Sequence, residues 1–238
     1  MNFNNYYNKE PDTYCYLKKK LSISRKEFFK SLLEKNIDSH SQVKLAYLFA
    51  NRLHTFIDIF YGKNNVDFLD CGGGLGFIST ELSKLLGYNV YCCDPSPSIK
   101  KIFNTIYRKE FFFQSDIQSL PKFKKKYNII YLREVYPFTR NANFKNQKKL
   151  IKILNNQLKA NGLIIFEMIK NKKDLFDNLS KFNFKFKIIP LLPVKFGKNY
   201  FLNFIVFKST ILQQLIKYIY KLFNKKISYF ILIYKFLN

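Results

Sequence analysis

Glycines that follow an acidic residue form the pattern with the clearest chemical meaning in this chain. Asp70 ends a short apolar segment, residues 66–69, and glycines then stand at positions 72, 74 and 76. Glycine has no Cβ and permits positive φ, so such a turn lets the backbone approach a ligand closely at the carboxyl end of a strand. The dinucleotide fingerprint G-x-G-x-x-G would require a third glycine at position 77, which is Phe77. The pattern is instead D-x-G-x-G-x-G.

Two further acids lie at the ends of the next two predicted strands. Asp94 ends the second strand, twenty residues after Gly74, where a carboxylate can accept hydrogen bonds from ribose hydroxyls. Asp116 follows the apolar residues 111–113. Each acid alone also fits an ordinary role, the first as a helix cap and the other two as turn residues. Those roles leave unexplained why all three stand at successive strand ends.

The order of these segments resembles the class I S-adenosylmethionine-dependent methyltransferases. The resemblance covers residues 65–208 and includes a long helix that ends at Asn161-Gly162 before an apolar strand. It implies an α/β fold, namely a Rossmann-like, doubly wound, seven-stranded mixed sheet with an antiparallel closing strand, N-terminal helices and a C-terminal helical tail. The acid before the turn suits this cofactor, because its ammonium and sulfonium groups tolerate a carboxylate, whereas a pyrophosphate does not.

The resemblance also implies which residues bind S-adenosylmethionine. The first acid and the three alternating glycines would hold the methionine end, Asp94 the ribose, and Asp116 with Ile117 the adenine. The full set expected at the cofactor is Asp70, Cys71, Gly72, Gly73, Gly74, Gly76, Asp94, Pro95, Asp116, Ile117 and Leu132.

The acceptor is expected to face the segment after the fourth predicted strand, residues 127–132. There Arg133 could contact an anionic acceptor, Glu134 could contact the cofactor or the acceptor, and Tyr136 could orient the acceptor. In the alternative, Arg133 and Glu134 pair with each other or with solvent. His54, in the helix predicted over residues 41–60, is a further candidate base because histidine titrates near neutral pH, and a structural role is its alternative.

The same segment limits the classes of acceptor that are expected. It has no Asn/Asp-Pro-Pro-Tyr/Phe sequence, which disfavours an exocyclic base amine, and no cysteine, which disfavours cytosine-C5 methylation. Small-molecule O-methyltransferases of the quinone-biosynthesis type have Glu-x-x-Glu-His here, whereas this chain keeps Glu134 but has Pro137 and Phe138 at the last two positions. We expect in-line methyl transfer to a hydroxyl of a small-molecule or saccharide acceptor. The alternatives are an RNA methyltransferase and a catalytically silent module that binds the cofactor or a partner.

The amino-acid composition limits which binding partners and which cellular location are expected. The net charge of +25 invites a nucleic-acid interpretation, but lysine is enriched along the whole chain together with Asn, Ile, Phe and Tyr, which disfavours a dedicated nucleic-acid groove. The four cysteines show no C-x-x-C spacing, so neither a metal site nor a disulfide framework is expected, and the pattern suits a reducing cytoplasm. We expect no signal peptide and no transmembrane helix.

The chain is expected to divide into an N-terminal helical cap over residues 1–60, a methyltransferase domain over residues 61–208 and a basic amphipathic helical tail over residues 209–238. Two aromatic segments, residues 182–189 and 200–207, are predicted to be the antiparallel closing strands.

The tail is predicted to carry an apolar stripe. The stripe consists of Ile211, Leu215, Ile219 and Leu222, which are spaced to lie on one face of a helix. The lysines of this segment face away from the stripe. Such a stripe could dock on the domain's own core or on a second subunit. Alternatively, it could give the cytoplasmic protein a peripheral contact with the inner membrane surface. The sequence leaves the oligomeric state open.

Overall fold

The computed structural model describes most of the chain from residue 39 onward. The described residues are 39–62, 65–74, 76–88, 90–95, 111–135, 138, 144–168, 173–182, 184–193, 196, 199–223 and 228–235. The helix predicted over residues 98–108 and residues 1–38 of the predicted N-terminal cap lie outside them.

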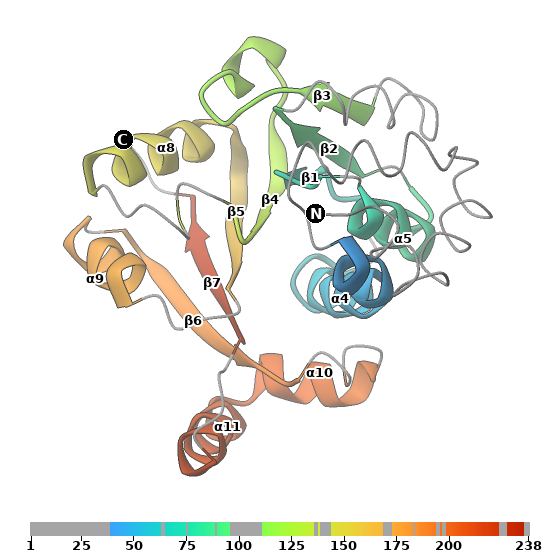
Figure 1. The fold of residues 1–238 in the computed structure, drawn as a ribbon, viewed down its shortest axis with the longest axis vertical. Helices are drawn as coiled ribbons and strands as arrows, with labels where there is room; N and C mark the ends of the chain where they lie inside the picture. The colour runs from blue at the N-terminus through green and yellow to red at the C-terminus, as the bar shows by residue number, and fades with distance from the viewer. Residues whose placement is uncertain are drawn as a thin grey trace, which may run out of the picture.

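The described strands form one seven-stranded sheet in the order β3-β2-β1-β4-β5-β7-β6 (Figure 1). In chain order they are β1 (Phe68–Cys71), β2 (Tyr91–Asp94), β3 (Phe112–Gln114), β4 (Tyr127–Arg133), β5 (Leu158–Met168), β6 (Phe186–Leu191) and β7 (Ser228–Tyr234). Neighbours among the first five strands pair in parallel, and β7 pairs antiparallel with both β5 and β6. The predicted doubly wound mixed sheet with an antiparallel closing strand is confirmed.

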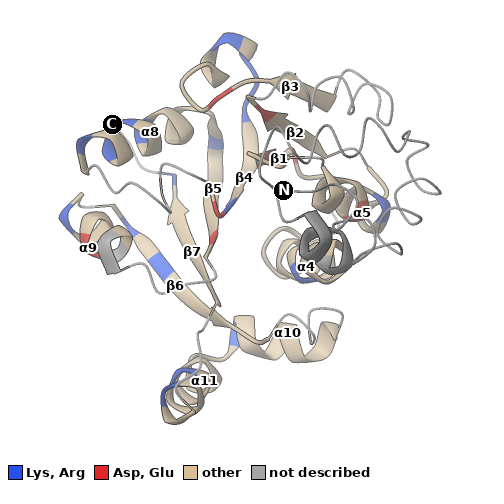
Figure 2. Cartoon of the chain, in the orientation of Figure 1, with Lys and Arg blue, Asp and Glu red and all other residues tan. Residues whose placement is uncertain are grey.

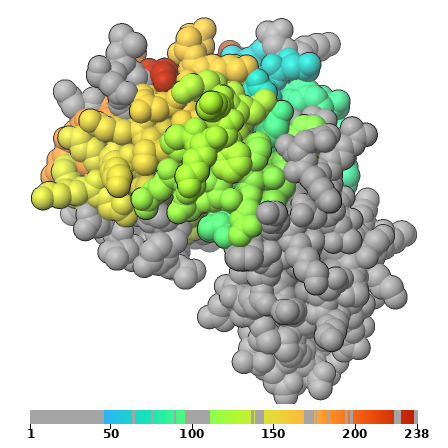
Figure 3. Space-filling view, turned by 90° about the horizontal axis from the view of Figure 1, so that it is seen from above, coloured from blue at the N-terminus to red at the C-terminus, as the bar shows by residue number. Residues whose placement is uncertain are grey.

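Helices cover both faces of the sheet, because successive strand residues point to opposite faces and both sets are apolar (Figure 1). On one face α4 (Ser39–Tyr61) and α5 (Phe77–Leu86) pack on buried residues such as Ile129 and Tyr131. On the other face α8 (Phe144–Asn156) and α9 (Lys173–Lys181) pack on Ile130 and Leu132. In Figure 3 the segments around residues 111–135, in green, and 144–168, in yellow, form one continuous surface.

The C-terminal part differs from the prediction in two elements. Residues 200–207, predicted as a closing strand, belong to the helix α10 (Tyr200–Lys208), so that prediction is wrong. The helix α11 (Thr210–Leu222) follows as predicted, but the antiparallel closing strand is β7, which lies inside the segment predicted to be an entirely helical tail. The side chain of Asn199 caps α10 by accepting a hydrogen bond from the N–H of Leu202, and this cap favours helix over strand.

Candidate active site

The glycine turn between β1 and α5 is held to the end of the neighbouring strand β2. The N–H groups of Gly72 and Gly73 both donate to the carbonyl oxygen of Cys93, at 2.8 and 3.2 Å. Gly72, Gly74 and Gly76 have φ values of 78°, 56° and 69°, in the left-handed region that favours glycine. The alternating spacing seen in the sequence is therefore required by the backbone of this turn.

The two middle glycines of the turn meet different surroundings. A Cβ on Gly73 would lie 2.6 Å from Sγ of Cys92 and 2.7 Å from Cγ of Asp70, so the turn packs tightly on the ends of β1 and β2. A Cβ on Gly74 would meet no described atom within 4 Å. Gly74 therefore borders space where a ligand can approach the backbone.

Asp70 is buried behind the turn. Its Oδ2 accepts a hydrogen bond of 2.7 Å from Oγ of Ser79, in the first turns of α5. Burial raises the pKa of Asp70 to about 6, while the Ser79 hydrogen bond and the positive charge of Arg133 act in the opposite direction. The carboxyl group of Asp70 thus joins β1 to α5 beneath the glycines. Its predicted contact with the methionine end of the cofactor stays a prediction.

Asp94 stands at the end of β2 and contacts the same turn. Its Oδ2 accepts a hydrogen bond of 3.2 Å from the N–H of Gly74, and its carbonyl oxygen accepts one of 3.2 Å from the N–H of Ser115. The ends of β1, β2 and β3 therefore meet at Asp94. The next residue, Pro95, is exposed.

Asp116 forms a turn of its own after β3. Its exposed carboxylate accepts a hydrogen bond of 2.8 Å from the N–H of Ser119 through Oδ1, as an ordinary turn residue does. Its predicted contact with the adenine stays a prediction. Three other residues expected at the cofactor, Cys71, Ile117 and Leu132, are buried in the core on the α8 side of the sheet.

The segment after β4 packs directly on the glycine turn. A Cβ on Gly72 would lie 2.9 Å from Cγ2 of Val135. The preceding residue, Glu134, has a φ of 51°, which is uncommon for a residue with a side chain, and its N–H donates to the carbonyl oxygen of Glu167 at 3.4 Å. The guanidinium of Arg133 lies 4.1 Å from the ring centre of Phe49 in α4. The structure thus brings two of the predicted acceptor residues, Arg133 and Glu134, to the edge formed by the turn.

The other predicted acceptor positions lie elsewhere. Tyr136 is outside the described residues. Phe138, at the position of the missing histidine, is buried with its ring centre 4.7 Å from that of Phe166, so this position belongs to the core. His54 is half-buried in α4, and residues two apart on a helix point about 200° apart, so it projects away from the side of α4 that carries Arg52. A role for His54 as base stays a prediction.

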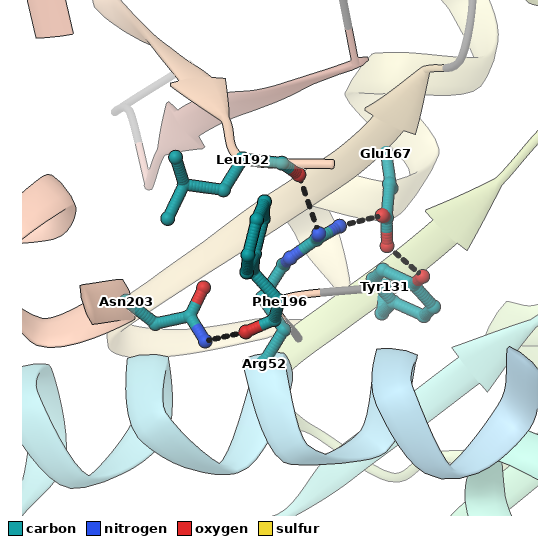
Figure 4. Close-up of polar contacts among 6 residues, drawn as sticks. All are labelled: Arg52, Tyr131, Glu167, Leu192, Phe196 and Asn203. Atoms are coloured by element: carbon teal, nitrogen blue, oxygen red, sulfur yellow. Dashed lines mark hydrogen bonds and ion pairs between the residues drawn. The ribbon is translucent and has the colours of Figure 1, made fainter. Parts of the chain in front are cut away.

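A buried polar network between α4, β4 and β5 was missed by the sequence analysis (Figure 4). Nη1 of Arg52 donates to Oε1 of Glu167 at 2.8 Å, and Nη2 donates to the carbonyl oxygen of Leu192 at 2.8 Å. The hydroxyl of Tyr131 donates to Oε2 of Glu167 at 2.5 Å. All three charged or phenolic side chains are fully buried. Burial and the Glu167 carboxylate raise the pKa of Tyr131 well above its usual value.

The signal for this network in the sequence is weak. Glu167 stands inside an otherwise apolar strand, and a carboxylate there needs a partner because a buried, unpaired charge is costly. The partner, Arg52, lies 115 residues earlier in the chain, so it could only be found with the topology known. The network holds α4 against the carboxyl ends of β5 and β6. Among the described residues, no cluster of three side chains suited to a metal ion occurs.

Comparisons with known proteins bear on the family and the fold of this chain. Residues 69–166 match the model of a family described as a methyltransferase domain. A structure of the plantazolicin methyltransferase BpumL in complex with SAH has a TM-score of 0.55 at 15% identity, over 98% of this chain and 99% of that chain. Another, of BpumL with a monoazolic desmethylPZN analog and SAH, has a TM-score of 0.56 at 16% identity, over 97% and 93%. Magnesium protoporphyrin IX methyltransferase (ChlM) from Synechocystis PCC 6803 with bound SAM has a TM-score of 0.52 at 10% identity, over 89% and 90%. No curated protein matches the chain.

The sheet order, the glycine turn and the family match define a class I methyltransferase domain. Residues 69–166 match the model of this family, and the chain has the fold of S-adenosylmethionine-dependent methyltransferases. The site fits the cofactor, because Gly74 leaves space where a Cβ would stand and the carboxylate of Asp94 lies beside it.

Proposed function

We propose that this enzyme methylates a hydroxyl group of a small-molecule or saccharide acceptor. The observation that carries the proposal is the packing of Val135 on Gly72, since a Cβ at Gly72 would lie only 2.9 Å from the Val135 side chain. The segment expected to face the acceptor is thereby adjacent to the turn expected to face the cofactor. Glu134, the neighbour of Val135, is half-buried and held in a left-handed backbone conformation, a strain that proteins commonly retain at functional sites.

Methyl transfer to a hydroxyl requires that the acceptor be aligned with the methyl group and that a base accept the hydroxyl proton. S-adenosylmethionine supplies an electrophilic methyl group with a good leaving group when bound, so the protein contributes chiefly orientation and base catalysis. Glu134 would accept the proton of the acceptor hydroxyl. Arg133 would bind an anionic group on the acceptor, which the buried Nε of Arg133 supports because it has no hydrogen-bond partner among the described residues.

The structural neighbours carry names that refer to acceptors other than nucleic acid. BpumL is named for plantazolicin and was solved with a desmethylPZN analog, and ChlM is named for magnesium protoporphyrin IX. At 16% and 10% identity these likenesses show the fold alone, so the acceptor class rests on the proposal itself.

The proposal is tested by methyl transfer from isotope-labelled S-adenosylmethionine to pools of sugars and hydroxylated metabolites, with products located by mass spectrometry. We expect an O-methylated product, and we expect Glu134→Gln to lower kcat by about a hundredfold or more while cofactor affinity stays unchanged. The matched control is Glu81→Gln, which removes an acid that pairs with Lys84 on the surface of α5. A product methylated only at nitrogen or carbon, or full activity of Glu134→Gln, would contradict the proposal.

An RNA acceptor is the second candidate, and the net charge of +25 favours it. Figure 2 shows the basic residues distributed over several elements, including α8, α9, β6 and α11, rather than gathered on one. RNA binding that falls steeply with salt, together with transfer of label to RNA, would favour this candidate. Cofactor binding without turnover on any pool would favour the silent module.

A further inference from the structure

The apolar stripe of α11 faces away from the protein core. Its side chains are exposed along the whole helix: Ile211 (82%), Leu215 (49%), Ile219 (41%) and Leu222 (62%). Tyr218, on the same side of the helix, is 60% exposed. On α10 Phe201 is exposed as well, at 68%. Exposed apolar residues scattered singly are ordinary, but a continuous stripe of this kind marks a surface that binds something.

The opposite side of α11 is the one that packs on the domain. Ile216 is buried in the core, and Gln213 is buried with its Nε2 donating to the carbonyl oxygen of Val206 at 2.8 Å. Ser209 caps the helix by accepting a hydrogen bond from the N–H of Leu212. This anchorage fixes the rotation of α11. The stripe therefore does not dock on the domain's own core, contrary to one alternative left by the sequence.

The two helices are also placed at the edge of the sheet that carries the candidate active site. Both β5 and β6 pair antiparallel with β7, so β5 and β6 run in the same direction. The chain enters α10 after the carboxyl end of β6 and returns to the sheet at Ser228, which pairs with Leu191 at that end. Glu167 stands near the carboxyl end of the parallel neighbour β5. The α10–α11 excursion thus leaves from and returns to the edge on which the glycine turn lies (Figure 1).

The charge of the α10–α11 region indicates which kind of surface it can bind. Residues 178–238 contain no Asp or Glu, and the exposed Lys208 and Lys221 border the apolar surface. On the helix Lys217 and Lys221 lie along one flank of the stripe. A face that combines apolar residues with cations matches the interface of an anionic bilayer. A second copy of the same face would bring like charges together, which disfavours self-association.

We infer that α10 and α11 bind this methyltransferase to the surface of a bilayer that contains anionic lipids. The stripe enters the interface while the lysines contact the headgroups, and the active-site edge of the sheet lies beside the membrane. Among the described residues, no helix could span a bilayer. This inference concerns the surface of α10 and α11 and does not depend on the identity of the acceptor.

The experiment is flotation of the full-length protein with vesicles of phosphatidylcholine alone and of phosphatidylcholine with phosphatidylserine. We expect binding to the mixed vesicles and much weaker binding to the neutral ones. The triple variant Ile211→Gln/Leu215→Gln/Leu222→Gln should lower the partition coefficient by about a hundredfold or more, because it removes the apolar insertion. Lys221→Gln should lower it about fivefold at low salt.

Two controls separate this inference from its competitors. Phe123→Gln changes an aromatic residue that is 39% exposed in the 3-10 helix η2 (Leu120–Phe123), far along the chain from the stripe, and should float like the wild type. Sedimentation without lipid reports self-association. The inference would be overturned if the triple variant and the wild type float equally. It would also be overturned if the wild type binds no vesicles but forms a dimer that the triple variant does not form. Methyl transfer in solution is read separately, so its failure and the failure of membrane binding are distinguishable.

Discussion

The backbone N–H of Gly74 donates a hydrogen bond of 3.2 Å to Oδ2 of Asp94. This bond joins the glycine turn after β1 to the end of β2, twenty residues further along the chain. It brings a glycine with positive φ together with the carboxylate expected to bind the ribose. Gly74, predicted to hold the methionine end, and Asp94, predicted to hold the ribose, are therefore in direct contact.

The two middle glycines of the turn should respond differently to a methyl group. Gly73→Ala should lower the free energy of unfolding by about 1–3 kcal/mol, because its Cβ would lie 2.6 Å from Sγ of Cys92. Gly74→Ala places a Cβ in open space at a φ of 56°, so it should cost about 1–2 kcal/mol and weaken S-adenosylmethionine binding at least tenfold. Urea unfolding and calorimetric titration of both variants measure these effects. Wild-type cofactor affinity in Gly74→Ala would show that the ligand does not approach this glycine.

The carboxyl group of Asp70 should make stability depend on pH. Its pKa is raised from 3.8 to about 6 by burial, so the folded state binds a proton more tightly than the unfolded state does. The stability associated with this group is fully present below pH 3.8 and is lost as the pH rises through about 6, an effect of about 3 kcal/mol.

The variant Asp70→Asn removes this titration and keeps an acceptor for the hydroxyl of Ser79. Its stability relative to the wild type should therefore increase by about 2–2.5 kcal/mol between pH 4 and pH 7. Urea unfolding of both proteins across this range measures the difference. A difference that stays constant with pH would contradict the buried titrating carboxyl group.

The buried pair Arg52–Glu167 should show strong coupling. Arg52→Met leaves the Glu167 carboxylate buried without its cation, which should cost about 3–5 kcal/mol of stability. The double variant Arg52→Met/Glu167→Met removes both charges and should be more stable than Arg52→Met alone. A double-mutant cycle by urea unfolding measures the coupling. Losses that simply add would show that the two charges do not stabilise each other.

Most of the sheet could be predicted from the sequence because its signals are local. The glycine turn and the acids at the ends of β1, β2 and β3 each lie within a few residues of the strand that positions them. The helix α8 and the strand β5 follow from a one-sided apolar pattern and a run of apolar residues. Their boundary was predicted wrongly, because α8 ends at Asn156 and Asn161-Gly162 lies inside β5.

The wrong prediction of a strand in the C-terminal part arose where the local hydrophobic pattern is ambiguous. Residues 200–207 are apolar almost throughout, and a short run of this kind does not distinguish a buried strand from a helix by its periodicity. The deciding signals were the capping residues Asn199 and Ser209, which start α10 and α11. The pairing of β7 between β5 and β6 depends on contacts distant in sequence, as does the pair Arg52–Glu167.

The central claim, that the glycine turn and Asp94 together bind S-adenosylmethionine, is tested most directly by calorimetric titration of wild type, Asp94→Ala and Asp67→Ala with S-adenosylmethionine and S-adenosylhomocysteine. Asp67 is the matched control, because it pairs with Lys125 and Lys159 before β1, away from the turn. We predict that wild type and Asp67→Ala bind both ligands and that Asp94→Ala binds them about 10–100-fold more weakly. Undiminished affinity in a folded Asp94→Ala, or no binding by the wild type, would contradict the account.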